Sequence, residues 1–169
     1  MNVRSDLKVT MGGDPLTIVG NLLNVGDIAP DFTVVDANLK EVKLSDFSGK
    51  KVVIAVYPSI DTSVCAAQNR HFNADVNKMG DVVVLSISCD LPFAQSRFCA
   101  AEGLKNIITL SDHRDLDFGT KYGFVIKELR LLTRGTVIVG TDNKIKYIEH
   151  VKENVNEPDY AKAMEIIKG

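Results

Sequence analysis

Three runs of mostly β-branched residues predict the strands at the centre of this protein. They cover Val52–Tyr57, Val82–Ile87 and Thr136–Val139. A continuous apolar run is typical of a strand buried on both faces, because a strand with one face in water alternates apolar and polar residues. The turn-forming pair Asp142 and Asn143 follows the third run and predicts a hairpin to a further strand over Ile145–Ile148.

Helices and hairpins are expected around these strands. The helical stretches cover Val64–Lys78, Pro92–Glu102 and Pro158–Lys168. Two hairpins precede the first apolar run, one joining Leu7–Thr10 to Leu16–Val19 and one joining Asp31–Val35 to Lys40–Leu44. The order of these elements predicts an α/β fold, with a central mixed sheet that carries helices on both faces and an N-terminal β-hairpin.

The thioredoxin-like architecture fits this order of elements. Hydrophobic periodicity alone also permits other α/β sandwiches, so the choice between them stays open at this point. No repeat, low-complexity tract or linker interrupts the chain, and residues 1–169 are therefore interpreted as a single domain.

Composition narrows the classes of function. The chain is 45% hydrophobic and 25% charged, the profile of an ordinary soluble globular protein. Its net charge of -2 favours neither nucleic acid nor a membrane surface as a partner, since both usually require clustered Lys and Arg. No apolar stretch approaches the roughly 18 residues of a membrane span, and the first residues lack the apolar core of a secretory signal. The reducing cytoplasm is therefore the expected compartment.

The three cysteines are Cys65, Cys89 and Cys99. An odd and small number argues against a structural disulfide framework. In a reducing compartment, a disulfide between two of them is expected to be transient and catalytic.

Cys65 follows the first buried strand and a short loop. Because Asp61, Thr62 and Ser63 are all good N-cap residues, a helix is expected to begin there, with Cys65 in its first turn. Unpaired N–H groups and the helix dipole favour a thiolate at that position. Helical spacing turns Cys65 toward the protein body, and a small buried core residue is the common fate of a free cysteine. Position alone leaves both interpretations open.

Cys99 is expected on the polar side of its helix, because Phe93, Ala94 and Leu104 mark the apolar side. Packing does not explain a thiol on a polar face, so Cys99 is either available to a partner thiol or simply tolerated. Cys89 ends a buried strand and is interpreted as a packed thiol.

The remaining polar residues carry weaker signals. His71 is interpreted as structural, because the backbone separates it from Cys65 by more than one helical turn. Arg134 precedes a buried strand, where an arginine usually reaches solvent but can also reach a thiolate across the sheet. The Cys and His spacings match no zinc template, and Gly12-Gly13 lacks the context of a nucleotide-binding loop. No metal and no cofactor are therefore expected.

The segment from Pro58 to Cys65 has the form P-x-x-x-T-x-x-C and resembles the active-site motif of the peroxiredoxins. Its fuller wording, P-S-I-D-T-x-V-C, resembles the bacterial thiol peroxidase subfamily of atypical two-cysteine peroxiredoxins. Asp90–Cys99 and Glu157–Tyr160 resemble other parts of that subfamily, so the resemblance covers nearly the whole chain. It implies a thioredoxin-like fold and a homodimer that reduces hydrogen peroxide and alkyl hydroperoxides with thioredoxin as the reductant.

The resemblance also implies roles for five residues. Cys65 would be the peroxidatic cysteine and Cys99 the resolving cysteine. Thr62 would hydrogen-bond the thiolate and the incoming peroxide, and Pro58 would shield the pocket from water. Arg134 would stabilise the thiolate from across the sheet.

Two points in this assignment stay open. Arg130 lies close to Arg134 in the chain, and the stretch between them is not distinctive. Some relatives carry their third cysteine where this chain has Ser86, so the resemblance gives no role to Cys89.

A disulfide between Cys65 and Cys99 would require movement. The two residues are expected on separate helices, one facing the protein body and one facing out, whereas a disulfide needs Cα atoms within roughly 7 Å. Local unwinding of the Cys65 turn, the Cys99 helix or both is therefore predicted.

Other functions remain for comparison. A thioredoxin-type disulfide reductase needs a C-x-x-C pair, which this chain lacks. A redox-sensing binding protein that uses the two cysteines as a switch without turnover, and a scaffold with incidental thiols, both stay possible on sequence alone.

Overall fold

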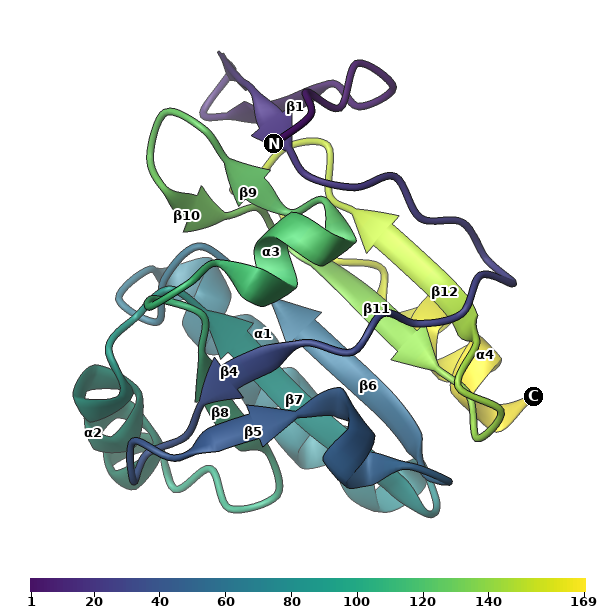
Figure 1. Ribbon diagram of the computed structural model, residues 1–169. Coiled ribbons are helices and arrows are strands. Elements are labelled where there is room, and N and C mark those ends of the chain that lie inside the picture. Colours follow the sequence, from purple (N-terminus) through teal and green to yellow (C-terminus); the bar gives the residue numbers. More distant parts are fainter.

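The predicted apolar runs form the centre of a mixed sheet in the computed structural model, which describes residues 1–169. The seven strands lie in the order β12-β11-β6-β7-β8-β4-β5 (Figure 1). Their bounds are Ile145–His150 (β12), Gly135–Val139 (β11), Lys51–Val56 (β6), Val82–Ser88 (β7), Ile108–Ser111 (β8), Thr33–Val35 (β4) and Glu41–Lys43 (β5). β6, β7 and β8 run parallel, while β11 is antiparallel to both of its neighbours. The central mixed sheet is therefore confirmed.

Four α-helices accompany the sheet: α1 (Ser63–Asp75), α2 (Pro92–Glu102), α3 (Asp117–Tyr122) and α4 (Tyr160–Lys168). The prediction is met for α2, whereas α1 ends early because Val76–Lys78 tighten into a 3₁₀ turn, η2. A second 3₁₀ turn, η1, covers Leu44–Phe47. α4 begins two residues later than predicted, because the Asp159 carboxylate accepts the N–H of Lys162 at 2.9 Å and caps the helix there.

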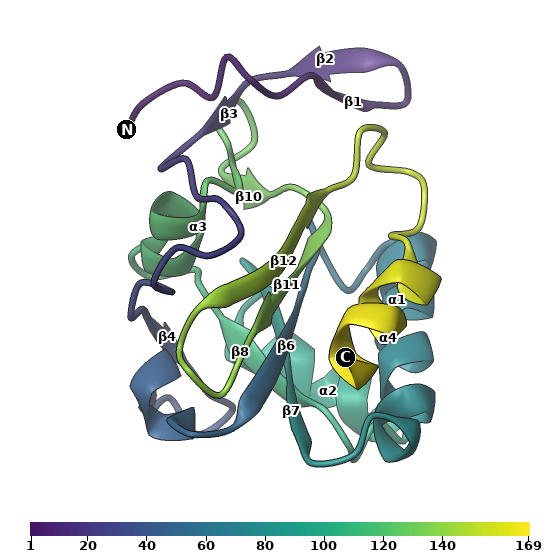
Figure 2. The same ribbon diagram turned by 90° about the vertical axis from the view of Figure 1, so that its right-hand side faces the viewer.

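Each face of the sheet has its own apolar core. Successive side chains of a strand point to opposite faces, so Ile54 and Val56 of β6 pack toward α3, whereas Val53 and Ala55 pack toward the other helices. Figure 2 shows α1 and α4 on one side of the sheet and α3 on the other. Helices on both faces are therefore confirmed.

The N-terminal hairpin is shorter than predicted. β1 (Val9–Met11) pairs with β2 (Asp14–Leu16) through a turn in which Gly12 and Gly13 have φ values of 60° and 88°. The chain then leaves the hairpin, because the N–H of Thr17 donates to the Glu128 carboxylate instead of to β1. The next residues form β3 (Ile18–Val19), in a small sheet with β9 (Val125–Ile126) and β10 (Leu131–Leu132).

The buried face of α2 differs from the predicted one. Phe93 is 63% exposed, while Gln95 is fully buried and Cys99 is half-buried. Gln95 can be buried because its amide donates to the carbonyl of Leu110 at 2.8 Å and to Ser88 Oγ at 3.1 Å. The prediction that Cys99 lies on the outward, polar face is therefore wrong: Cys99 packs against the core beneath the helix.

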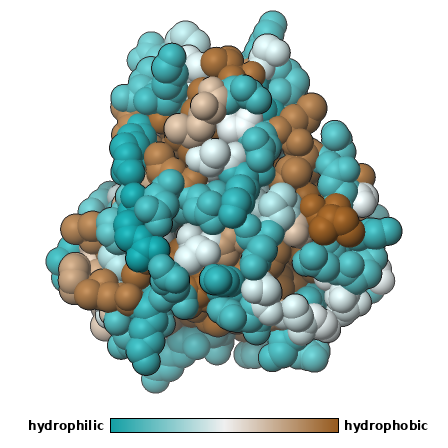
Figure 3. All heavy atoms as spheres, viewed as in Figure 1, coloured by the Kyte–Doolittle hydropathy of each residue, from teal (hydrophilic) through white to brown (hydrophobic).

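On the face in Figure 3, hydrophobic residues lie in separate groups among hydrophilic ones. Exposed apolar side chains such as Leu22, Phe93 and Leu129 come from distant parts of the chain. None of the helices has the length and apolar character that a membrane-spanning helix needs.

Candidate active site

Cys65 lies in the first turn of α1, beyond the carboxyl end of the central strand β6. Ligands in open α/β sheets bind at that edge. Thr62, one of the three N-cap candidates, is the N-cap: its Oγ1 accepts the N–H of Cys65 at 3.4 Å and donates to the carbonyl of Ser59 at 3.1 Å. The Thr62 hydroxyl thus bonds the backbone of Cys65 rather than its sulfur. Cys65 itself is fully buried.

Arg134 reaches Cys65 because of strand register. Gly135, the next residue, begins β11 and pairs with Val56 at the end of β6, so Arg134 lies at the same sheet edge as the Cys65 loop. Arg134 is 2% exposed, and its Nη2 donates to Cys65 Sγ at 3.2 Å. Arg130, the alternative, is exposed and donates to the carbonyl of His113.

Two further residues hold the Arg134 side chain. Its Nη1 donates to Gln68 Oε1 at 2.8 Å, and its Nε donates to the carbonyl of Asn154 at 2.9 Å. Both partners are buried, and neither was predicted. Gln68 could have been found, because it follows Cys65 by three residues and so shares the buried side of α1. Asn154 carries no signal in the sequence.

This arrangement suits a nucleophilic thiolate. A guanidinium in contact with the sulfur favours the charged form of Cys65, and so does the N-terminal end of α1. Because Asn154 accepts from Nε and Gln68 accepts from Nη1, the guanidinium is oriented with Nη2 directed at the sulfur. The thiolate is the reactive form of cysteine, so the site can carry out attack by sulfur on an electrophile.

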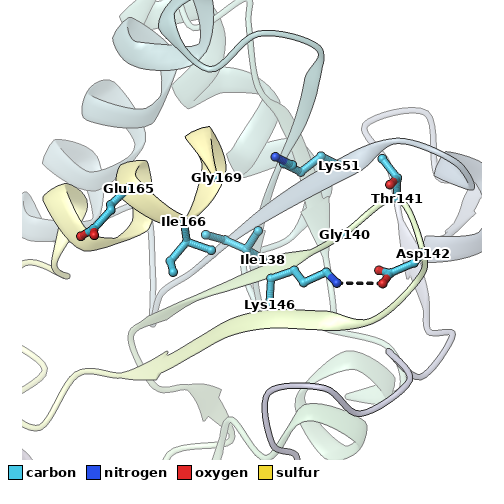
Figure 4. A pocket seen from close by; sticks show the side chains of 9 residues that line it. All are labelled: Lys51, Ile138, Gly140, Thr141, Asp142, Lys146, Glu165, Ile166 and Gly169. Atoms are coloured by element: carbon cyan, nitrogen blue, oxygen red, sulfur yellow. Dashed lines mark hydrogen bonds and ion pairs between the residues drawn. The ribbon is translucent and has the colours of Figure 1, made fainter.

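A cavity of about 200 Å³ lies beside this site. Its lining residues are Met11, Pro58, Thr62, Ser63, Val64, Arg134, Asn154 and Val155. Pro58 is buried at its wall, while Met11 comes from the N-terminal hairpin. A larger hollow of about 600 Å³ lies at the other end of β6, where Lys51 begins the strand (Figure 4). That hollow is a full strand length away from Cys65.

A chain of buried hydrogen bonds ties the Cys65 turn to the sheet. Tyr57 OH lies 2.7 Å from Ser86 Oγ, which donates to Asn69 Oδ1 at 2.5 Å, and Asn69 Nδ2 donates to the carbonyl of Cys65 at 3.0 Å. Burial raises the pKa of Tyr57, so its hydroxyl stays neutral and remains a donor. The first turn of α1 is therefore fixed by hydrogen bonds to the sheet as well as by its N-cap.

The other two thiols lie in different surroundings, and all three cysteines are free. Cys99 Sγ donates to Thr109 Oγ1 at 3.8 Å, and burial raises the pKa of Cys99. Burial, followed by the nearby Asp112 carboxylate, raises the pKa of Cys89 to about 12. Both are therefore neutral thiols in this conformation. Cys65 belongs to a separate apolar cluster from the one that Cys99 packs against.

The Asp90 carboxylate connects the active-site loop to the start of α2. It accepts Ser59 Oγ at 2.7 Å and the N–H of Ile60 at 2.9 Å. Asp90 immediately precedes Leu91, the N-cap of α2. The segments that carry Cys65 and Cys99 are thus held together in this conformation.

His71 is placed as a structural residue. Its Nε2 lies 2.9 Å from an oxygen of the Asp75 carboxylate, and its ring stacks on Tyr160 with ring centroids 3.7 Å apart. No hydrogen bond joins it to Cys65.

Comparison with known proteins identifies relatives along nearly the whole chain. Residues 24–164 match the Redoxin family model. The thiol peroxidase of Staphylococcus aureus (strain COL) is 52% identical over 161 residues, which cover 95% of this chain and 98% of that protein. The thiol peroxidase of Bacillus subtilis (strain 168) is 50% identical, with 95% and 96% covered.

A solved structure is similar to this chain in both fold and sequence. The peroxiredoxin-like protein from Aquifex aeolicus superposes with a TM-score of 0.89 at 36% identity, covering 95% of both chains. The predicted thioredoxin-like fold is thereby confirmed.

Proposed function

Since the chain belongs to the Redoxin family and, within it, to the bacterial thiol peroxidases, we propose that Cys65 is the peroxidatic residue and Cys99 the resolving residue of a thioredoxin-dependent peroxidase. Peroxidase activity follows from the family. The assignment of residues is supported above all by the 3.2 Å contact between Arg134 Nη2 and Cys65 Sγ at the start of α1.

In the first step, the Cys65 thiolate attacks one oxygen of the hydroperoxide. An S–O bond forms as the O–O bond breaks, so Cys65 becomes a sulfenic acid and the second oxygen leaves and takes a proton as water or an alcohol. Arg134 and the N–H groups of the first turn stabilise the charge on sulfur and on the leaving oxygen. Thr62 orients the peroxide beside the sulfur, and Pro58 limits the entry of water into the cavity.

In the second step, the Cys99 sulfur attacks the sulfenic acid sulfur, a disulfide forms, and water leaves. Cys99 must first leave the core beneath α2, where burial keeps it a neutral thiol. Local unwinding therefore both brings the sulfurs together and allows Cys99 to ionise. Thioredoxin then restores both thiols by two exchange reactions, in which its own dithiol is oxidised.

We further propose that the protein works as a homodimer in the cytoplasm. An odd number of free thiols and a reductant of the thioredoxin type both suit a reducing compartment. Sedimentation equilibrium of the reduced protein tests the dimer, and a mass of one chain at micromolar concentration would contradict it.

The enzymatic proposal is tested by peroxide-dependent NADPH oxidation with thioredoxin and thioredoxin reductase. Wild type should turn over continuously with hydrogen peroxide and with cumene hydroperoxide, whereas Cys65→Ser should be inactive. Cys99→Ser should consume one equivalent of peroxide and accumulate a sulfenic acid that dimedone labels. Cys89→Ser is the matched control and should keep its turnover.

Each outcome distinguishes one alternative. Continuous turnover by Cys65→Ser would refute the peroxidatic assignment, and continuous turnover by Cys99→Ser would refute the resolving assignment. Consumption of a single equivalent by wild type would instead favour a redox switch. A mixed disulfide trapped with a thioredoxin that lacks its second cysteine tests the partner directly.

A further inference from the structure

The orientation of the Arg134 side chain depends on a loop as well as on the sheet. Besides the bond from its Nε to the carbonyl of Asn154, its own N–H donates to Asn154 Oδ1 at 2.7 Å. Asn154 is 2% exposed, and its Nδ2 also donates to Thr133 Oγ1 at 3.0 Å. A displacement of Asn154 would therefore move the guanidinium relative to the sulfur of Cys65.

The loop that carries Asn154 has no helix or strand of its own. It covers residues 151–159, between β12 and α4. Its backbone pairs with the N-terminal hairpin: the N–H of Thr10 donates to the carbonyl of Lys152 at 2.8 Å, and the N–H of Asn154 donates to the carbonyl of Thr10 at 2.8 Å. Figure 2 shows the hairpin lying across the outer side of this loop.

The Glu153 carboxylate adds a second connection to the same hairpin. It accepts Thr10 Oγ1 at 2.7 Å and the N–H groups of Gly12 and Gly13 at 2.9 and 3.0 Å. The left-handed conformation of both glycines makes the turn a concave group of donors that suits an anion. These bonds, the one from Thr10 first, favour the charged carboxylate and lower the pKa of Glu153 to about 2.

The hairpin is itself attached to a separate part of the body. Val9 belongs to a small apolar cluster with Ile18 of β3 and Ile126 of β9, apart from both cores of the main sheet. An isolated two-stranded hairpin is only marginally stable, so this cluster gives it a fixed base. The base lies on β3 and β9, and the tip reaches the loop of Asn154.

We propose that the N-terminal hairpin braces the active site: Thr10 and Glu153 fix the loop of Asn154, and Asn154 in turn directs Arg134 at Cys65. Thr10, Glu153 and Asn154 are positioning residues. The inference rests on the proposed role of Arg134 at the thiolate and extends it to an element outside the main sheet.

Two substitutions test the brace. Glu153→Gln places an amide NH₂ where the turn offers only donors, and Thr10→Val removes one donor without a change in charge. The first readout is the rate at which iodoacetamide alkylates Cys65 from pH 5 to 9, followed by peptide mass spectrometry. The second is the second-order rate constant for peroxide reduction. Both rates at pH 7 should fall by about threefold to tenfold, less than the roughly 100-fold cost of a 1 Å displacement.

The shape of the pH profile separates a change in the position of Arg134 from a general loss of structural stability. The alkylation deficit should shrink toward pH 9, where base alone ionises thiols. Asp36→Asn is the matched control, because Asp36 also accepts backbone N–H groups in a turn, from Asn38 and Lys40, but lies between β4 and β5 at the edge of the main sheet and bonds neither the hairpin nor Arg134. It should leave both rates within twofold of wild type, as a roughly neutral surface change.

Three results would overturn the inference, each for a different reason. If Arg134→Lys slows both rates but Glu153→Gln and Thr10→Val do not, the brace is wrong while the proposed function stands. If Asp36→Asn slows both rates as much as Glu153→Gln, the effect is a general loss of stability and not the positioning of Arg134. If Arg134→Lys itself changes neither rate, the proposed role of Arg134 fails, and the brace fails with it.

Discussion

Replacing Arg134 with Lys keeps a positive charge but removes the planar guanidinium, which donates hydrogen bonds in fixed directions. The guanidinium donates at once to the sulfur of Cys65, to Gln68 Oε1 and to the carbonyl of Asn154. Lysine offers a compact ammonium group that cannot span three partners on different elements. We therefore expect Arg134→Lys to impair both the reaction and the stability of the fold.

The two losses have different sizes. A hydrogen bond to a charged group contributes about 1.5–3 kcal/mol, and each 1.4 kcal/mol corresponds to about tenfold in rate. Loss of the bond to Cys65 should therefore slow peroxide reduction by about 10- to 150-fold. Gln68 and Asn154 are both buried, and each acceptor left without a donor costs about 1–3 kcal/mol. The free energy of unfolding should fall by about 2–4 kcal/mol, if the ammonium partly replaces one bond.

Stopped-flow measurement of single-turnover peroxide reduction, combined with urea unfolding, separates the two losses. Arg130→Lys is the matched control, since Arg130 is exposed and donates only to the carbonyl of His113. It should change the rate by less than about twofold. Folded Arg134→Lys protein with a rate within threefold of wild type would refute the reasoning, and so would an equal loss in Arg130→Lys.

Three further predictions concern pH, movement and close packing. Burial lowers the pKa of His150 from 6.5 to about 4, so its contribution to stability is complete above pH 6.5 and is lost as the pH falls toward 4. Over that range, wild type should lose up to about 3 kcal/mol more unfolding free energy than His150→Phe, and parallel urea-derived curves would contradict this. Asp90→Ala removes the carboxylate that accepts hydrogen bonds from Ser59 and Ile60. Amide exchange in residues 58–64 should therefore accelerate, and the disulfide should form faster after one peroxide turnover. Unchanged rates of both would show that Asp90 does not restrain the active-site loop. Gly135→Ala would set a Cβ against the carbonyl oxygen of Glu149 on the paired strand, and should lower Tm by at least about 4 °C, whereas a wild-type Tm would show that the strands can separate.

Local chemistry accounts for the elements that could be predicted. The N-cap at Thr62 and the position of Cys65 in the first turn depend on a few neighbouring residues, and so do the buried strands. The buried face of α2 could not be predicted from apolarity, because Gln95 is buried through bonds to Ser88 and Leu110, which belong to two different strands. A polar side chain is buried wherever distant groups satisfy it, and helical periodicity carries no information about those groups.

The sequence by itself determined that Cys65 lies in the first turn of a helix, because a helix start is encoded locally. Only the tertiary structure decided which arginine contacts its sulfur. Arg130 and Arg134 are four residues apart, and the register of β11 against β6 brings the second to the sulfur. The tertiary structure also supplied Gln68, Asn154 and the hairpin behind them. Their contacts join residues that lie 20 to 144 positions apart, and such contacts follow from packing and strand register, not from spacing along the chain.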